Sequence, residues 1–528
     1  MGIHVNLYIF SERIDPNEWR MVYLETLQLL QAWPGGILGF REEQVDGTNR
    51  LSYSSNFEHA ADDWKKRHWW VDGDQESGQF GESFRLYADL YVYRRPKKKI
   101  KQDKGGMLAQ LRSISDAQGT VFDSKTQGHP YHYAMLAVAM LIEDRFPHAA
   151  LAAGDITLPQ SRKARQTICE LLGRDVALPI LVEGARLLQE CFKQFGQEEG
   201  LQEFFYAFHG DERDHVAAIE LAAQAVEPSV LRRCHAIRMS QFPDPNTLGF
   251  RGLCQDWMRA TGDLASLIDI ACLDKDGPRV RPIELANALV AIWLTVPPDA
   301  ITSLPRPEEN PIELPTINDL FCDVMFRLSG LRGLNTYVYV DINTFLDVFQ
   351  FHFPNQIENI RREVIVMQDK ILTDVVKMNE KYAKLIQEEC KNQEIDQGIS
   401  FGLDDLRHIH PSTPLHEETA NLLDGWAKGL QTSMQHLYSI FPEIAFQNID
   451  DLRTSIYDVT YGRYLVLTER EWGWIDRETD RKILLVVLML LAIDDNSDLF
   501  VNTRKVLLES PFALSAVCER MTDFKWNG

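Results

Sequence analysis

The spacing of apolar residues changes about a third of the way along the chain. Val5, Leu7 and Ile9 alternate with polar neighbours, and the same period of two recurs over residues 84–93. Such alternation is typical of strands with one face in a core. After Pro179 apolar residues recur at steps of three and four, which indicates helices. We therefore predict an α+β or α/β N-terminal domain followed by a mostly α-helical C-terminal region.

Local signals within the first 175 residues predict both helices and strands. Asp15 and Pro16 are an N-cap and a first helical residue, so a helix should begin there. Residues 132–142 are apolar almost all round and predict a buried helix. Residues 149–153 predict a short buried strand, and residues 160–172 a further helix.

The length of 528 residues predicts two to four domains. We expect a mixed α/β domain at 1–175, a helical domain at 176–296 and a second helical domain at 316–528. Six prolines fall within residues 297–315 and predict a linker, because proline interrupts helices and central strands.

The longest helical pattern lies near residues 355–391, inside the last predicted domain. A helix of that length needs a partner helix to bury its apolar stripe. The stripe that follows Pro414, from Leu423 to Leu437, is the partner that we predict.

Charge is the most informative part of the composition. The chain has 55 Lys and Arg residues against 77 Asp and Glu, a net charge of −22. Residues 1–165 hold 21 of each sign, so the whole excess lies in the rest of the chain. This balance repels nucleic-acid phosphate and anionic lipid, so we expect neither a nucleic-acid nor a membrane partner. It favours a basic protein partner, because a negative field speeds encounter with a cation.

The eight cysteines are scattered, without a C-x-x-C pair. This distribution predicts reduced thiols packed as small apolar residues, and hence a cytoplasmic location. The longest apolar run, residues 483–493, is far shorter than the ~20 residues of a membrane-spanning helix, so we interpret it as a buried helix.

Three histidines flanked by carboxylates lead to a first hypothesis, a metal site. His408, His410 and His416 lie within nine residues, and such imidazoles can hold Zn²⁺ with an open fourth position. The spacing matches no known zinc motif, and an exposed polar turn before a helix explains the same residues. We therefore expect no cofactor, with zinc as the alternative.

A polar site is the second hypothesis. His129 and His132 lead into the predicted buried helix, and Asp155 follows the strand at 149–153. Ligands gather at the carboxyl ends of strands in α/β proteins, so these residues are candidates for acid/base work if they meet. The alternative is that Asp155 caps a helix.

An aromatic surface is the third hypothesis. Tyr87, Tyr91 and Tyr93 alternate along the predicted strand at 84–93, and Trp69 and Trp70 precede it. Tyr and Trp are enriched where one surface buries against another, so these side chains are candidates for partner binding. The alternative is that a helix of the same chain covers them.

Together these features predict a soluble cytoplasmic protein that binds another macromolecule and performs no bond-making chemistry. An acidic neutraliser of a basic protein, of the immunity or antitoxin kind found in bacteria, is its concrete form. The alternatives are a metal-dependent hydrolase with a His-rich site and a structural subunit of a larger assembly. The sequence leaves the oligomeric state open.

Overall fold

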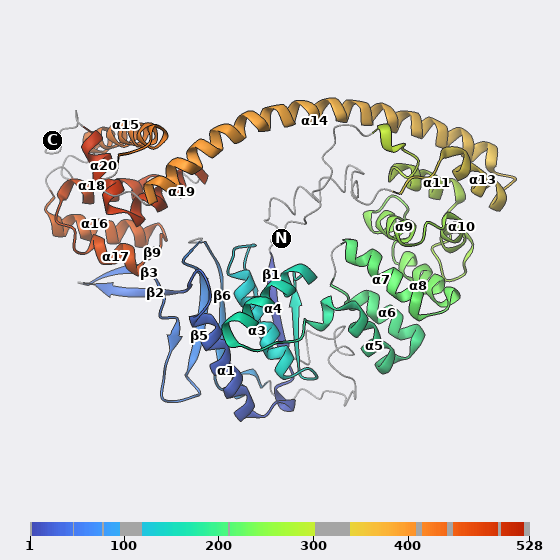
Figure 1. The fold of residues 1–528 in the computed structure, drawn as a ribbon, viewed down its shortest axis with the longest axis horizontal. Coiled ribbons are helices and arrows are strands. Elements are labelled where there is room, and N and C mark those ends of the chain that lie inside the picture. Colours follow the sequence, from blue (N-terminus) through green and yellow to red (C-terminus); the bar gives the residue numbers. More distant parts are fainter. Residues whose placement is uncertain are drawn as a thin grey trace. The chain divides into compact units, whose positions relative to one another are not determined.

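The structure, a computed structural model, divides into two compact units (Figure 1). The N-terminal unit is Met1–Ile37 with Glu58–Lys384, and the C-terminal unit is Leu38–Phe57 with Leu385–Gly528. The described residues are 3–45, 47–76, 79–94, 119–209, 212–300, 338–407, 414–440, 447–494 and 498–521.

A small antiparallel sheet anchors the α/β part of the N-terminal unit. Strand β1 (His4–Ile9) lies between β7 (Gly119–Lys125) and β8 (Ala150–Gly154). Helix α3 (His132–Arg145) packs against β1 and β8 and is buried over nearly its whole length, as its uniformly apolar sequence predicts.

Capping residues set the ends of the two other helices of this part, and the Asp15 cap of the first is as predicted. Helix α1 (Pro16–Gln31) begins directly after Asp15, whose carboxylate accepts hydrogen bonds from the backbone N–H groups of Asn17 and Glu18. Helix α4 (Leu158–Leu172) begins with a capping box at Thr157 and ends at Gly173, whose φ of 62° is left-handed.

The second group of strands corrects one prediction. Strand β5 (His68–Asp74) pairs antiparallel with β4 (Glu58–His59) and with β6 (Phe80–Tyr87). The strand predicted over residues 84–93 therefore ends at Tyr87, and the 3₁₀ turn η2 (Leu90–Tyr93) follows. The reason is local, because the Asp89 side chain accepts the Tyr91 N–H and starts the turn.

Helical elements form the rest of the N-terminal unit. They are η1 (Ser11–Arg13), η4 (Ile180–Val182), α5 (Gly184–Phe195), α6 (Gln197–Ala207), α7 (Glu212–Ala225), α8 (Pro228–Ser240), α9 (Leu248–Thr261), α10 (Leu264–Ile268), η5 (Asp269–Leu273), α11 (Pro282–Ala291), η6 (Pro298–Ala300) and α13 (Ile342–His352).

Helix α14 (Ile357–Arg407) is one continuous helix of 51 residues, whose first part, to Lys384, belongs to the N-terminal unit (Figure 1). It extends well beyond the helix predicted near 355–391. The apolar stripe becomes sparse there, but a polar run rich in Glu, Gln and Lys still favours helix.

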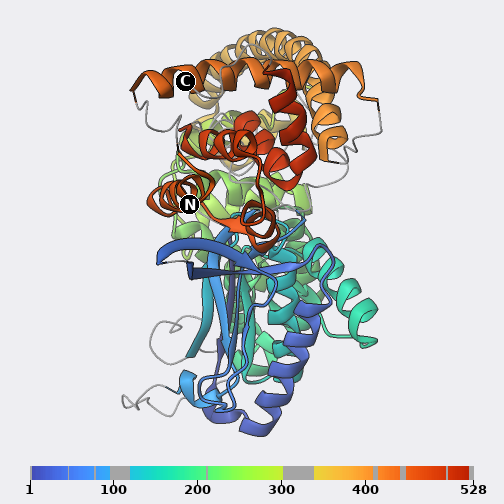
Figure 2. The same ribbon diagram turned by 90° about the vertical axis from the view of Figure 1, so that its left-hand side faces the viewer.

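A β-hairpin from the N-terminal sequence forms part of the C-terminal unit (Figure 2). Strands β2 (Ile37–Val45) and β3 (Thr48–Ser54) pair antiparallel, and β3 pairs in parallel with β9 (Leu467–Thr468). The other elements of the unit are α15 (Glu417–Ile440), α16 (Ile449–Gly462), α17 (Glu469–Ile475), α18 (Arg481–Ala492), α19 (Asp498–Glu509) and α20 (Pro511–Arg520).

Helix α18 lies at the centre of the C-terminal core, and residues 483–491 are all buried, as the apolar run predicts. The stripe of α15, which includes Leu423 and Leu430, packs mainly against α18 and α20. The predicted pairing of this stripe with the helix near 355–391 is wrong. The core helices bury this stripe instead.

Arg50 joins the hairpin to the helices of this unit. Its guanidinium contacts Asp476 Oδ2 at 2.8 Å and Glu43 Oε2 at 3.0 Å, and its side chain is 13% exposed. Tyr457 donates to the other oxygen of Asp476 at 2.6 Å, and burial followed by this contact raises the pKa of Tyr457 to about 12. The Tyr457 hydroxyl therefore stays a donor at neutral pH, and all the partners of Asp476 are satisfied together.

The fold class predicted from the sequence is confirmed, with strands and helices mixed in the N-terminal region and a mostly helical region after it. No helix within the described ranges is both long and apolar enough to cross a membrane. The predicted domain boundaries stay predictions, and residues 301–315 of the predicted linker lie outside the described residues.

Replacing Arg50 with Met should lower the free energy of unfolding by about 2–3 kcal/mol. The change keeps most of the volume but leaves two half-buried carboxylates without their cation. Urea unfolding followed by tryptophan fluorescence measures it. The matched control is Arg470→Met, at an exposed position of α17, and an equal loss in both variants would contradict the assignment.

Glu143 is a buried carboxylate that joins α3 to its surroundings. Its two oxygens accept the backbone N–H groups of Ala152 and Ile180, each at 2.7 Å. Burial raises the pKa of Glu143 to about 7, against the opposing effects of these donors and of Arg186 at 3.8 Å.

Glu143 should make the protein less stable as pH rises from about 5 to about 8. Between its ordinary pKa and about 7 the folded state holds a proton that the unfolded chain has lost, so stability falls through this window. Glu143→Gln does not titrate, so the stability of wild type relative to this variant should decline by about 1–3 kcal/mol from pH 5 to pH 8. Urea unfolding at both pH values measures the change, and parallel profiles would refute it.

Candidate partner-binding surface

The structure separates the residues of the predicted polar site. His132 is fully buried, its Nδ1 lies 2.8 Å from Thr126 Oγ1, and burial lowers its pKa to about 4. Asp155 is exposed and accepts the His4 backbone N–H at 2.8 Å. His129 Nδ1 contacts Gln79 Oε1 at 3.0 Å. In the described part of the chain, no hydrogen bond or ion pair joins any two of His129, His132 and Asp155.

The predicted aromatic surface is divided between core and solvent. Trp69 is fully buried and donates its indole N–H to Thr26 Oγ1 at 3.1 Å. Tyr93 is also buried, and its hydroxyl accepts the Tyr87 backbone N–H at 2.8 Å. Tyr87 and Trp70 are half-buried. Tyr91 is 55% exposed, so it alone of the five presents most of its ring to solvent.

Helix α1 of the same unit covers the inner part of this group. Trp19 of α1 meets Tyr93 edge to face, with ring centroids 5.6 Å apart. The interpretation that the chain's own helix covers these aromatics therefore describes Trp69 and Tyr93, which belong to the core.

The predicted metal site falls mostly outside the described residues, because His408 and His410 are not among them. His416 is exposed just before α15. Within the described ranges, no three His, Cys, Asp or Glu side chains are grouped as metal ligands would be. Free thiols are present at Cys169, Cys191, Cys234, Cys254, Cys272 and Cys518.

An aromatic residue with a strained backbone ends α16 in the C-terminal unit. Tyr464 has a φ of 58°, and its side chain is 76% exposed. It follows the last turn of the helix, where the Leu465 N–H reaches back to the Thr460 carbonyl at 2.8 Å. Glycine usually occupies this left-handed position, because a Cβ atom there costs energy.

Side chains of the β2–β3 hairpin contact both tyrosines at this end of α16. Phe40 of β2 stacks on Tyr464 with ring centroids 6.3 Å apart and planes at 18°. Tyr461, one turn earlier in α16, is 39% exposed and donates its hydroxyl to Glu42 Oε1 at 2.9 Å. We call Phe40, Glu42, Tyr461 and Tyr464, together with Asp458, the tyrosine corner.

Two unpaired carboxylates belong to the tyrosine corner. Asp458 lies three residues before Tyr461, hence on the same face of α16, and both Asp458 and Glu42 are exposed. Among the described residues, no cationic side chain lies within ion-pair distance of either carboxylate. Arg463, between the two tyrosines of the corner, is occupied by the Leu491 and Ile493 carbonyls and by Asp494.

The C-terminal unit as a whole is acidic. Its sequence holds 15 basic and 27 acidic residues, a net charge of −12, against −10 for the much longer N-terminal unit. Exposed aromatic rings beside unpaired carboxylates suit Lys or Arg, which bind both by charge and over the ring face. The tyrosine corner therefore has the side-chain types that bind cations.

Sequence reasoning did not identify the tyrosine corner, because its parts come from residues 40–42 and 458–464. Local sequence rules assign the left-handed conformation at this helix end to Gly462, the last residue of α16, rather than to Tyr464. Compared with known proteins, the chain matches no family model, no curated protein and no solved structure.

Tyr464→Gly should be more stable than Tyr464→Ala by about 1 kcal/mol. Both variants lose the ring and its contact with Phe40, so only the cost of a Cβ atom at positive φ separates them. Urea unfolding of the pair measures the difference. Equal stability, or a more stable alanine variant, would show that the left-handed conformation is absent in solution.

Proposed function

We propose that this protein works by binding a basic protein partner, and that the tyrosine corner is where it engages that partner's Lys or Arg side chains. The observation that carries the proposal is Tyr464, a large and mostly exposed ring on a left-handed backbone, grouped with two carboxylates that have no cationic partner among the described residues. Strain of this kind persists where surrounding structure enforces it, and it gathers at binding sites.

The distribution of charge supports the same partner. In the described part of the chain, the buried acidic residues are Asp72, Asp74, Asp89, Glu143 and Glu471. Glu471 is the one that belongs to the C-terminal unit, so the other described carboxylates of that unit face solvent at least in part. An outward negative field accelerates encounter with a cationic protein, and the rings then add short-range affinity.

An acidic neutraliser of the immunity or antitoxin kind is the specific form of this proposal. In that form the protein masks the cationic surface by which a basic toxin or nuclease approaches its target. The support is the charge and the surface chemistry of the C-terminal unit.

The test uses a short fluorescein-labelled arginine-rich peptide and fluorescence anisotropy. Tyr464→Gly removes the ring, and glycine adopts the left-handed backbone conformation of this position without strain. The variant should therefore bind the peptide about 3- to 10-fold more weakly. Glu42→Gln with Asp458→Asn should weaken binding at about 50 mM salt and lose most of that effect at about 200 mM, because the removed attraction is screened.

The matched control is Glu220→Gln with Glu227→Gln, which removes the same charge from exposed positions of the N-terminal unit. This variant should bind the peptide like wild type. If the control weakens binding as much as the corner variant, the attraction is spread over the whole protein and the tyrosine corner is not the site.

A further inference from the structure

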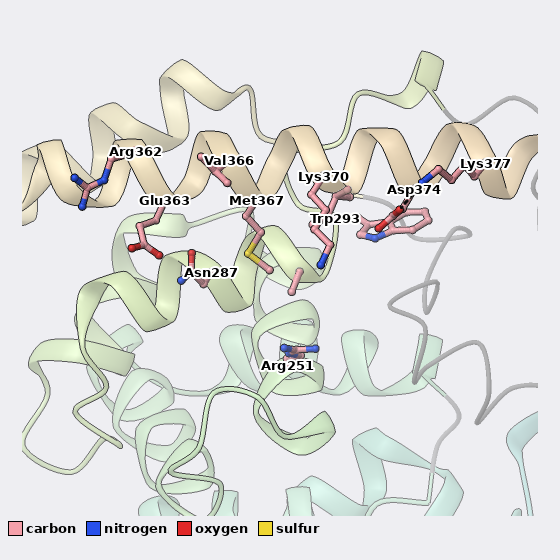
Figure 3. A pocket seen from close by; sticks show the side chains of 12 residues that line it. Arg251, Asn287, Trp293, Arg362, Glu363, Val366, Met367, Lys370, Asp374 and Lys377 are labelled. Atoms are coloured by element: carbon pink, nitrogen blue, oxygen red, sulfur yellow. Dashed lines mark ion pairs between the residues drawn. The ribbon is translucent and has the colours of Figure 1, made fainter.

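A groove in the N-terminal unit is lined by more cationic than acidic side chains, opposite in sign to the net charge of the chain. It runs between the first turns of α14 and the helices α9 and α11, with a volume of about 1010 Å³ (Figure 3). Its lining residues are Arg251, Asn287, Ala291, Trp293, Arg362, Glu363, Val366, Met367, Lys370, Ile371, Asp374 and Lys377. Four of these side chains are cationic and two are acidic, in a chain whose net charge is −22.

Most of the cations in the groove are available to a ligand. Among the described residues, no carboxylate lies within ion-pair distance of Arg251, Arg362 or Lys370. The Arg251 guanidinium donates hydrogen bonds to the Pro245 carbonyl and to the Asn246 side chain, both just before the start of α9. These three side chains are thus positive groups without an internal counter-charge.

The spacing along α14 argues for an extended ligand. Arg362, Lys370 and Lys377 are eight and seven residues apart, which at the rise of an α-helix places them about 12 Å and about 10 Å from one another. A single phosphate group cannot span such intervals. An extended peptide in the polyproline II conformation has three residues per turn and rises about 3.1 Å per residue, so its carboxylates three residues apart lie on one face at intervals of about 9 Å, close to both spacings.

Apolar and hydrogen-bonding groups lie between the cations. Val366 is 67% exposed although apolar, and it lies between Arg362 and Lys370 on one stripe of α14. Met367 and Ile371, four residues apart, form the neighbouring apolar stripe of the lining. On α11, the Oδ1 atom of Asn287 is buried without a hydrogen-bond partner, so it is an acceptor for a peptide N–H. A ligand that satisfies all of these is acidic, apolar at intervals and rich in N–H donors.

The groove is held in shape by a second strained aromatic residue. Trp293 follows α11 with a φ of 64°, and its turn is closed by bonds from Leu294 N to Leu289 O at 3.2 Å and from Val296 N to Trp293 O at 3.0 Å. Gln368 of α14 donates to the Thr295 carbonyl at 2.9 Å. Figure 3 shows the indole on the Asp374 and Lys377 side of the groove.

We propose that this groove binds an acidic, amphipathic peptide segment of a protein partner. Carboxylates of the segment pair with Arg362 and Lys370, and a further one pairs with Lys377, which also contacts Asp374 of its own helix at 3.8 Å. The apolar side chains of the segment contact Val366 and Met367, and its backbone donates to Asn287. The protein then has two binding surfaces of opposite sign, one in each unit.

The test uses a labelled peptide with glutamates three residues apart and leucines between them, and anisotropy on the full chain. Arg362→Glu with Lys370→Glu should raise the Kd at least about tenfold, because it reverses two of the charges that the peptide meets. Asn287→Leu should raise the Kd about 3-fold through the lost acceptor. Circular dichroism confirms that each variant is folded.

The matched control is Arg361→Glu, a charge reversal on the same helix outside the lining, which should leave the Kd within about 2-fold of wild type. A peptide of the same composition with its glutamates clustered should bind more weakly. Equal binding by the Arg362 and Lys370 variant, or by the clustered peptide, would overturn the proposal. So would displacement of the peptide by pyrophosphate at equal concentration, since that would identify a phosphate site.

Discussion

The C-terminal unit depends on a half-buried cluster of charges that joins residues 426 positions apart. Arg50, on the second strand of the hairpin, contacts Asp476 at 2.8 Å, while Glu43 and Tyr457 complete the cluster. A buried charge is tolerable only when its partners are in place, so the cluster forms in one arrangement or not at all. The indole of Trp472 adds a hydrogen bond to the Leu51 carbonyl at 2.8 Å. With the hairpin fixed in this way, Phe40 and Glu42 reach the end of α16, and the tyrosine corner exists.

The two proposed surfaces share a structural device. Each has an aromatic residue in the left-handed conformation at the end of a helix, Trp293 after α11 and Tyr464 after α16. Glycine would relieve roughly 1 kcal/mol of strain at such a position. Glycine, the usual residue at such a position, has no side chain, whereas the aromatic residue places a ring at the end of each helix. Tyr464 presents its ring to solvent, whereas Trp293 is nearly buried and shapes the wall of the groove.

Net charge describes the molecule only on average. The value of −22 correctly marks the chain as acidic, and it argues against broad attraction to phosphate or anionic lipid. It says nothing about a local groove, because screening limits each charge to about 8–10 Å. Within that distance the groove lining has four cations and two carboxylates, so it is locally positive although the chain as a whole is acidic. A protein with opposite charges on two surfaces is suited to join two different partners.

The sequence by itself determined the local elements, because their causes are local. The Asp15 cap, the helical pattern over residues 160–172 and the apolar run of α18 each predicted an element that the structure contains. It did not determine which elements meet. Trp69 and Tyr93 have the composition of a binding surface, yet α1 buries them, and His132 and Asp155 are not joined. The tyrosine corner and the groove were decided by tertiary structure alone, because each combines side chains from segments far apart whose contact no periodicity encodes.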